Sequence, residues 1–187
     1  MTPLSDQPAG DLHTALMGRV PHPEYLELTT ATFLTAEQRV AITLIALGET
    51  HESAAAVMNT APFAVLSVLS DASRHLDAAS SLAADPDPTL VHAAYRHPGF
   101  PPPYPDHHPC PTLTSTERLV LLAHSGGFAL DHMSQSRDIP LQRLTEADDQ
   151  LLIKLKARNP AHAVRRGWQL GLFTRQEDQY APPPQHR

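Results

Sequence analysis

The chain has 187 residues, a formal net charge of −6 and 41% hydrophobic residues. This balance excludes a generally basic nucleic-acid coat, although it is compatible with a local basic face. The single cysteine, Cys110, excludes an internal disulfide. The first residues have no secretory signal pattern, and the longest apolar run, Val40–Gly48, is too short to span a membrane. We therefore predict a soluble cytoplasmic protein without membrane contact.

Proline-rich stretches divide the chain, because proline cannot continue a helix or a central strand. A short helix is predicted at Asp11–Met17 and another at Leu90–Tyr95. The predicted segments are an N-terminal segment (1–30), a first Ala-rich helical region (31–84), a linker rich in proline and histidine (85–112), a second helical region (113–175) and a disordered tail (176–187).

The two helical regions align with each other. "LTAEQRVAITLIALG" from Leu34 and "LTSTERLVLLAHSGG" from Leu113 match without a gap at a separation of 79 residues. Thr35 and Thr114 suit helix N-caps, with Glu37 or Glu117 in the first turn, and Gly48 and Gly127 stand where a left-handed C-cap would end each helix. The pattern predicts two copies of one helical module.

Each copy continues with a short helix, a turn and a longer helix. The short helices are predicted at "HESAAAVM" and "ALDHMSQS", and the longer ones open near Pro62 and Pro140. This order is typical of a helix-turn-helix, although a plain helical hairpin used for packing has the same pattern. We therefore predict an all-α fold with two tandem helix-turn-helix modules joined by the linker.

The second copy resembles the LuxR-type (GerE-like) helix-turn-helix family across Leu113–Phe173. The matching positions at its start are Leu113, Thr114, Glu117, Val120 and Leu121, and those in its closing segment are Arg158, Asn159, Ala163, Val164, Gly171 and Leu172. The first copy is more loosely similar to the same family, or to region four of sigma factors. It is expected to stop before any closing helix.

The resemblance implies a transcriptional regulator whose third helix enters the major groove of double-stranded DNA. In the second copy the residues expected to hold DNA are Arg143, Lys154, Lys156 and Arg158, and in the first copy they are Ser67, Arg74 and His75. The resemblance also implies a homodimer through the closing helix, with Val164, Trp168 and Leu172 at four-residue steps. Two alternatives stay open: Trp168 completes the core of its own module, or the two modules of one chain form an internal pseudo-dimer.

Three acids in the expected reading helix argue against a simple transfer of that function. Glu146, Asp148 and Asp149 stand where the family meets phosphates and bases. A carboxylate that faces phosphate subtracts from affinity. The alternative hypothesis is therefore a protein-interaction module, in which this acidic helix binds a basic surface on another regulator, a sigma factor or a nucleoid protein.

The linker groups four potential zinc ligands, Asp106, His107, His108 and Cys110. Neighbouring side chains of an extended segment point to opposite sides, so we expect a solvated linker without metal, and a metal-responsive switch is a third hypothesis. The chain has no nucleophile elbow, P-loop or dinucleotide fingerprint. We therefore expect neither an enzyme nor a cofactor.

Overall fold

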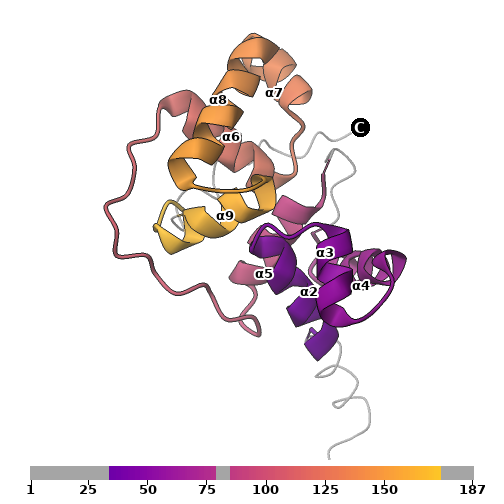
Figure 1. Cartoon of the computed structure of the whole chain (residues 1–187). Coiled ribbons are helices and arrows are strands. Elements are labelled where there is room, and N and C mark those ends of the chain that lie inside the picture. The colour runs from indigo at the N-terminus through magenta and orange to yellow at the C-terminus, as the bar shows by residue number, and fades with distance from the viewer. Residues whose placement is uncertain (1–33, 79–84, 174–187) are drawn as a thin grey trace, which may run out of the picture. The chain divides into compact units, whose positions relative to one another are not determined.

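A computed structural model describes residues 34–78 and 85–173 of the chain (Figure 1). These residues form eight α-helices and no strand, which confirms the all-α prediction for this part of the chain. The predicted helix at Asp11–Met17, the rest of the N-terminal segment and the predicted tail from residue 176 lie outside the described residues.

The first helix set consists of α2 (Ala36–Ala46), α3 (His51–Met58) and α4 (Pro62–His75). The Thr35 hydroxyl accepts the Gln38 backbone N–H, and the Gln38 side chain accepts the Thr35 N–H, so the expected N-cap is a capping box. Thr50 caps α3 through the Ser53 N–H. The three helices pack against one another.

The second helix set consists of α6 (Ser115–Gly126), α7 (Leu130–Arg137) and α8 (Leu141–Leu155). Thr114 and Glu117 form the same capping box at the start of α6. Here too the three helices pack pairwise. The predicted order of first helix, short helix and longer helix is thus present in both sets.

The turns of the two sets have matching backbone conformations. Each helix of the first set is followed by a residue with positive φ, and each helix of the second set has the same feature 79 residues later. The pairs are Gly48 (φ 85°) with Gly127 (72°), Asn59 (52°) with Asp138 (53°), and Asp77 (51°) with Lys156 (52°). Glycine adopts this region without cost, and Asn and Asp tolerate it better than other residues.

Helix α5 (Asp87–Arg96) occupies the first half of the segment that the sequence predicted to be a linker. The helix expected at Leu90–Tyr95 is present, but it is longer and buried. Leu90, Val91, Ala94 and Tyr95 recur at helical spacing and face the core. Pro88 sits in the first turn, where its missing N–H costs nothing.

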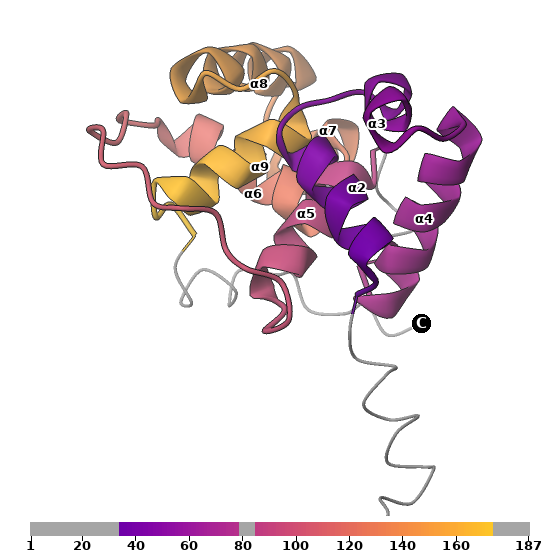
Figure 2. The ribbon, with the colours of Figure 1, turned by 60° about the horizontal axis from the view of Figure 1, so that its bottom comes forward.

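The closing helix α9 (Pro160–Gln169) packs along α5, and the two lie side by side in both views (Figures 1 and 2). Its N-cap is Asn159, whose side chain accepts the His162 N–H at 2.9 Å. Between them α5 and α9 contact α2, α6 and α8, so they lie between the two helix sets. One aromatic cluster covers their contact: His92, Tyr95, Phe100, Trp168 and Phe173.

Residues 97–114 run without helix from α5 to α6, as the prolines require. This loop is attached to the end of α9. The Asp106 N–H donates to the Gln169 carbonyl at 2.9 Å, and the Asp106 carboxylate pairs with Arg166 at 2.8 Å. The Gln169 side chain donates to the Tyr104 carbonyl at 3.3 Å.

Candidate binding faces on α4 and α8

The last two helices of each set are joined by a tight turn. Three residues separate α3 from α4, and three separate α7 from α8. The axes of α3 and α4 are bent by 100°. Helix-turn-helix pairs have angles of about 90–120° and turns of three or four residues. The outer faces of α4 and α8 are therefore the candidate binding faces of this chain.

The outer ridge of α8 is acidic. Leu144, Ala147, Leu151 and Leu155 are buried on the inner side. The opposite side presents a line of exposed residues at helical spacing: Gln142, Glu146, Asp149 and Ile153. The Gln142 side chain donates to Glu146 at 2.9 Å, and Ile153 is 66% exposed. This ridge carries two carboxylates and no cation.

The outer ridge of α4 occupies the corresponding positions of the first helix set and has a different character. It consists of Phe63, Ser67, Ser70 and Arg74, all exposed. Phe63 is 76% exposed, and the sequence pattern had not singled it out. Arg74 pairs with Asp71 on the same helix. The three DNA-binding residues expected in this set, Ser67, Arg74 and His75, are all exposed on α4.

Asp148 is turned away from the acidic ridge. Its carboxylate pairs with His124 Nε2 on α6 at 2.8 Å, and the two side chains are 21% and 13% exposed. The three acids predicted to act together therefore separate: Glu146 and Asp149 face outward, while Asp148 joins α8 to α6. The expectation that Asp148 shares an interaction surface with them is corrected, because its position on the helix points it toward the core.

Neutralising Asp148 and Asp149 one at a time should separate a packing role from a surface role. We expect Asp148→Asn to lower the free energy of unfolding by about 1 kcal/mol, because the pair with His124 is largely sheltered from water. Asp149→Asn on the exposed ridge should change it by less than about 0.5 kcal/mol. Urea denaturation of both variants measures the difference, and equal losses would contradict the assignment.

Lys154, expected to hold DNA, is engaged inside the chain. Its ammonium lies 2.8 Å from Glu117, whose side chain is only 5% exposed, and it also donates to the Thr112 carbonyl at 3.3 Å. Burial by itself would raise the pKa of Glu117, but the bonds from Lys154 and from the Thr114 N–H lower it below its usual value. Releasing Lys154 to a phosphate would leave that carboxylate without its charged partner.

Arg158 is also paired, across a separation of 109 residues in sequence. Its guanidinium donates to Glu49, between α2 and α3, at 2.9 Å. A bond from the Ser53 hydroxyl, and then Arg158 itself, lower the pKa of Glu49. Four cations of the second set were expected to hold DNA, and two of them, Lys154 and Arg158, are paired. The other two, Arg143 and Lys156, are exposed, and neither has an ion pair within 4 Å among the described residues.

The side chains expected to form a homodimer through the closing helix are used within the chain. Val164 is fully buried. The Trp168 indole N–H donates to His92 Nδ1 on α5 at 3.3 Å, and Leu172 packs on the edge of the core. These contacts lie within one chain, and Trp168 packs against α5 rather than only against the helices of its own module.

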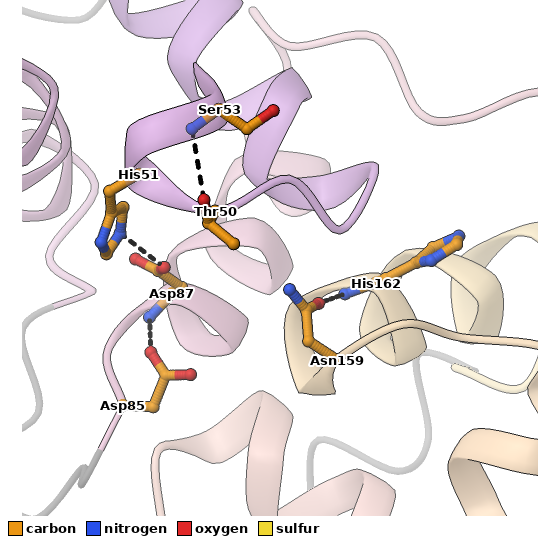
Figure 3. Close-up of polar contacts among 7 residues, drawn as sticks. All are labelled: Thr50, His51, Ser53, Asp85, Asp87, Asn159 and His162. Atoms are coloured by element: carbon orange, nitrogen blue, oxygen red, sulfur yellow. Dashed lines mark hydrogen bonds and ion pairs between the residues drawn. The ribbon is translucent and has the colours of Figure 1, made fainter. Parts of the chain in front are cut away.

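Polar side chains cluster where α3, α5 and α9 begin (Figure 3). His51 in the first turn of α3 reaches Asp87 in the first turn of α5, with 2.9 Å between Nε2 and Oδ2. Burial raises the pKa of Asp87, the Asp85 carboxylate adds to this, and His51 opposes it. This pair ties α3 to α5, and no spacing rule in the sequence connects two residues from separate helices.

His162 lies in the first turn of α9 (Figure 3). Its Nδ1 accepts the Arg158 backbone N–H at 3.2 Å, so the ring acts here as an acceptor. Burial, together with the charges of Arg165, Arg166 and Arg158, lowers its pKa to about 4. The imidazole is therefore neutral near pH 7 and belongs to the packing between α9 and the turn at Gly48.

The potential zinc ligands of the loop do not converge. Asp106 pairs with Arg166 and accepts the His108 N–H at 3.0 Å, while Cys110 is exposed. Within residues 34–78 and 85–173, no group of three or more His, Cys, Asp or Glu side chains is placed to hold a metal ion.

Comparison with protein-family models, curated proteins and solved structures gives no significant match. No single helix in the described part of the chain is long and apolar enough to cross a membrane. Helices α3 and α4 together have a suitable length and composition, but they are bent by 100° where they meet.

Proposed function

We propose that this protein is a regulatory protein of the helix-turn-helix type whose α8 ridge binds a basic surface on another protein. The observation that supports this most is the ridge itself: of its four residues Gln142, Glu146, Asp149 and Ile153, two are outward carboxylates and none is a cation. The exposed Arg143 lies to one side of this line. Two of the cations that a DNA-binding helix would use, Lys154 and Arg158, are paired with Glu117 and Glu49. A duplex would meet carboxylates at the centre of this face.

The same ridge suits a protein partner. Ile153, at one end of the ridge, is 66% exposed and supplies apolar contact beside the carboxylates. Protein interfaces combine apolar contact with complementary charge, which sets orientation and association rate. The partner class that fits is a basic regulator, a sigma factor or a nucleoid protein.

Double-stranded DNA is the second candidate target, and α4 supports it. Helices α3 and α4 meet at 100°, and Ser67, Ser70 and Arg74 face outward along α4. Hydroxyls and arginine contact phosphates and base edges. The α4 ridge carries a single arginine, which pairs with Asp71, so we expect DNA affinity at α4 to be low at physiological salt.

Binding assays over a salt series separate the two candidates. We expect no mobility shift of duplex DNA even at low salt, and salt-sensitive binding of an arginine-rich peptide used as a probe for basic surfaces. Replacing Glu146 with glutamine and Asp149 with asparagine should weaken peptide binding about five- to tenfold, since each exposed charge pair contributes about 0.2–1 kcal/mol.

The matched control removes two exposed acids outside the ridge, Glu37 and Asp131, by substitution with glutamine and asparagine. It changes net charge equally and should leave affinity nearly unchanged. Equal weakening by both double variants would show non-specific attraction and refute the proposal. A steep, salt-dependent DNA shift that Arg74→Ala abolishes would establish the DNA-binding alternative instead.

A further inference from the structure

We propose that α5 and α9 are corresponding helices of two copies of one four-helix unit, and that their contact is an internal pseudo-dimer interface. The first copy would consist of α2 to α5 and the second of α6 to α9. This inference does not depend on what the outer ridges bind. It concerns which surface could still accept a second copy of the chain.

The buried faces of α5 and α9 match at a separation of 73 residues. Inward-facing positions of α5 correspond to inward-facing positions of α9: Leu90 with Ala163, Val91 with Val164, Ala94 with Gly167 and Tyr95 with Trp168. The sequence comparison expected the first copy to stop before a closing helix. It did not relate the helix predicted at Leu90–Tyr95 to the closing helix. Eleven residues separate α4 from α5 and only four separate α8 from α9, so the 79-residue alignment breaks there.

Contacts across the pair are reciprocal. Trp168 on α9 donates to His92 on α5. The corresponding positions are Tyr95 on α5 and Arg165 on α9, and these two groups also interact: burial raises the pKa of Tyr95, and the nearby Arg165 charge opposes this. Exchanging the helices therefore turns one contact into the other, which is the property of a two-fold interface.

Residues near such an axis contact their own counterparts. Tyr95 and Trp168 correspond to each other, and their rings lie 6.1 Å apart between centroids. The surrounding helices follow the same exchange: α5 packs on α6, and α9 packs on α2. The contact between α5 and α6 includes a hydrogen bond from the Thr89 hydroxyl to the His124 carbonyl at 3.3 Å. The contact between α9 and the first helix set places His162 and Arg158 against Gly48, which follows α2.

The partner that fits the closing helix α9 is therefore α5 of the same chain. Val91 and Val164 have no exposed surface, so a second chain cannot contact them without displacing α5 or α9. One chain then presents two unlike ridges, one acidic on α8 and one with Phe63, serines and Arg74 on α4. Such a molecule suits a target with two different contact surfaces, whereas a homodimer suits a symmetric one.

Trp168 is the only tryptophan of the chain, so its fluorescence reports this interface directly. The test combines sedimentation of the full-length protein with Trp168 emission over a wide dilution series. We expect a blue-shifted emission that does not change on dilution. Tyr95→Ala should shift the emission toward the red while helical circular dichroism is retained. Val57→Ala, at an exposed position of α3, is the matched control and should not shift it.

A concentration-dependent dimer whose dissociation shifts Trp168 emission toward the red would overturn the proposal, because the contact would then form between chains. An unchanged emission in Tyr95→Ala, or an emission typical of exposed indole in the parent protein, would also overturn it. A dimer that forms without any change in Trp168 emission supports the proposal, since that association uses another surface.

Discussion

Replacing Gly48 with alanine is expected to lower the free energy of unfolding by about 2–4 kcal/mol, adding backbone strain to overpacking. Gly48 has φ +85°, where a side chain is strained. An added Cβ would also lie 3.0 Å from Arg158 Cβ and 3.1 Å from His162 Nδ1. These neighbours belong to the start of α9 and its preceding turn. The substitution therefore overpacks the contact between α9 and the first helix set.

Gly171 provides the control. It has φ +67°, but an added Cβ would meet nothing within 4 Å. Gly171→Ala should therefore show the backbone strain alone, about 1–2 kcal/mol. Urea denaturation of both variants isolates the packing contribution at Gly48 as their difference. Equal losses would mean that Gly48 is not in close contact with the Arg158 and His162 region in solution.

Lowering the pH from 6.5 to 4 is expected to destabilise the protein through His162. Burial and the nearby Arg165, Arg166 and Arg158 charges lower the folded-state pKa of this histidine from 6.5 to about 4. In this window the unfolded chain binds a proton that the folded chain does not. Stability from this residue is therefore complete above pH 6.5 and is lost as the pH falls toward 4.

The shift of the His162 pKa sets an upper limit of about 3 kcal/mol on this loss of folding free energy. Because the ring is only half buried, solvent screening should reduce the contribution to about 1–2 kcal/mol. His162→Asn keeps an acceptor near the position of Nδ1 but cannot be protonated. We expect the variant to lose stability less steeply between pH 6.5 and 4 than the parent protein does. Parallel curves would show that His162 does not carry this pH dependence.

The sequence predicted most helix boundaries in the described residues because the signals are local. Capping threonines lie three residues from their partners, and Gly48 and Gly127 mark positive-φ turns. Apolar spacing within one helix also identifies the buried face, as at Leu144 and Leu151 on α8. The length of α5 was underestimated because Pro88, which was expected to exclude helix, lies in its first turn.

The candidate site was predicted less well, because its charges depend on partners far away in sequence. Four cations were expected to face DNA, but Lys154 pairs with Glu117 and Arg158 with Glu49. Three acids were expected on one surface, but Asp148 turns to His124. Helical spacing gives the direction of a side chain on its own helix, but not which helix lies opposite.

By itself the sequence determined the all-α class, the caps and the two similar helix sets, since hydrophobic periodicity and turn residues act over a few positions. Only the tertiary structure decided which charged groups face solvent and where α5 belongs. A buried charged group needs a partner, and that partner can be far away in sequence: Lys154 lies 37 residues from the buried Glu117. The more exposed pair of Arg158 and Glu49 spans 109 residues. The acidic ridge of α8 is a result of this pairing. Asp148 pairs with His124, and Glu146 and Asp149 are the acids of this helix that face outward.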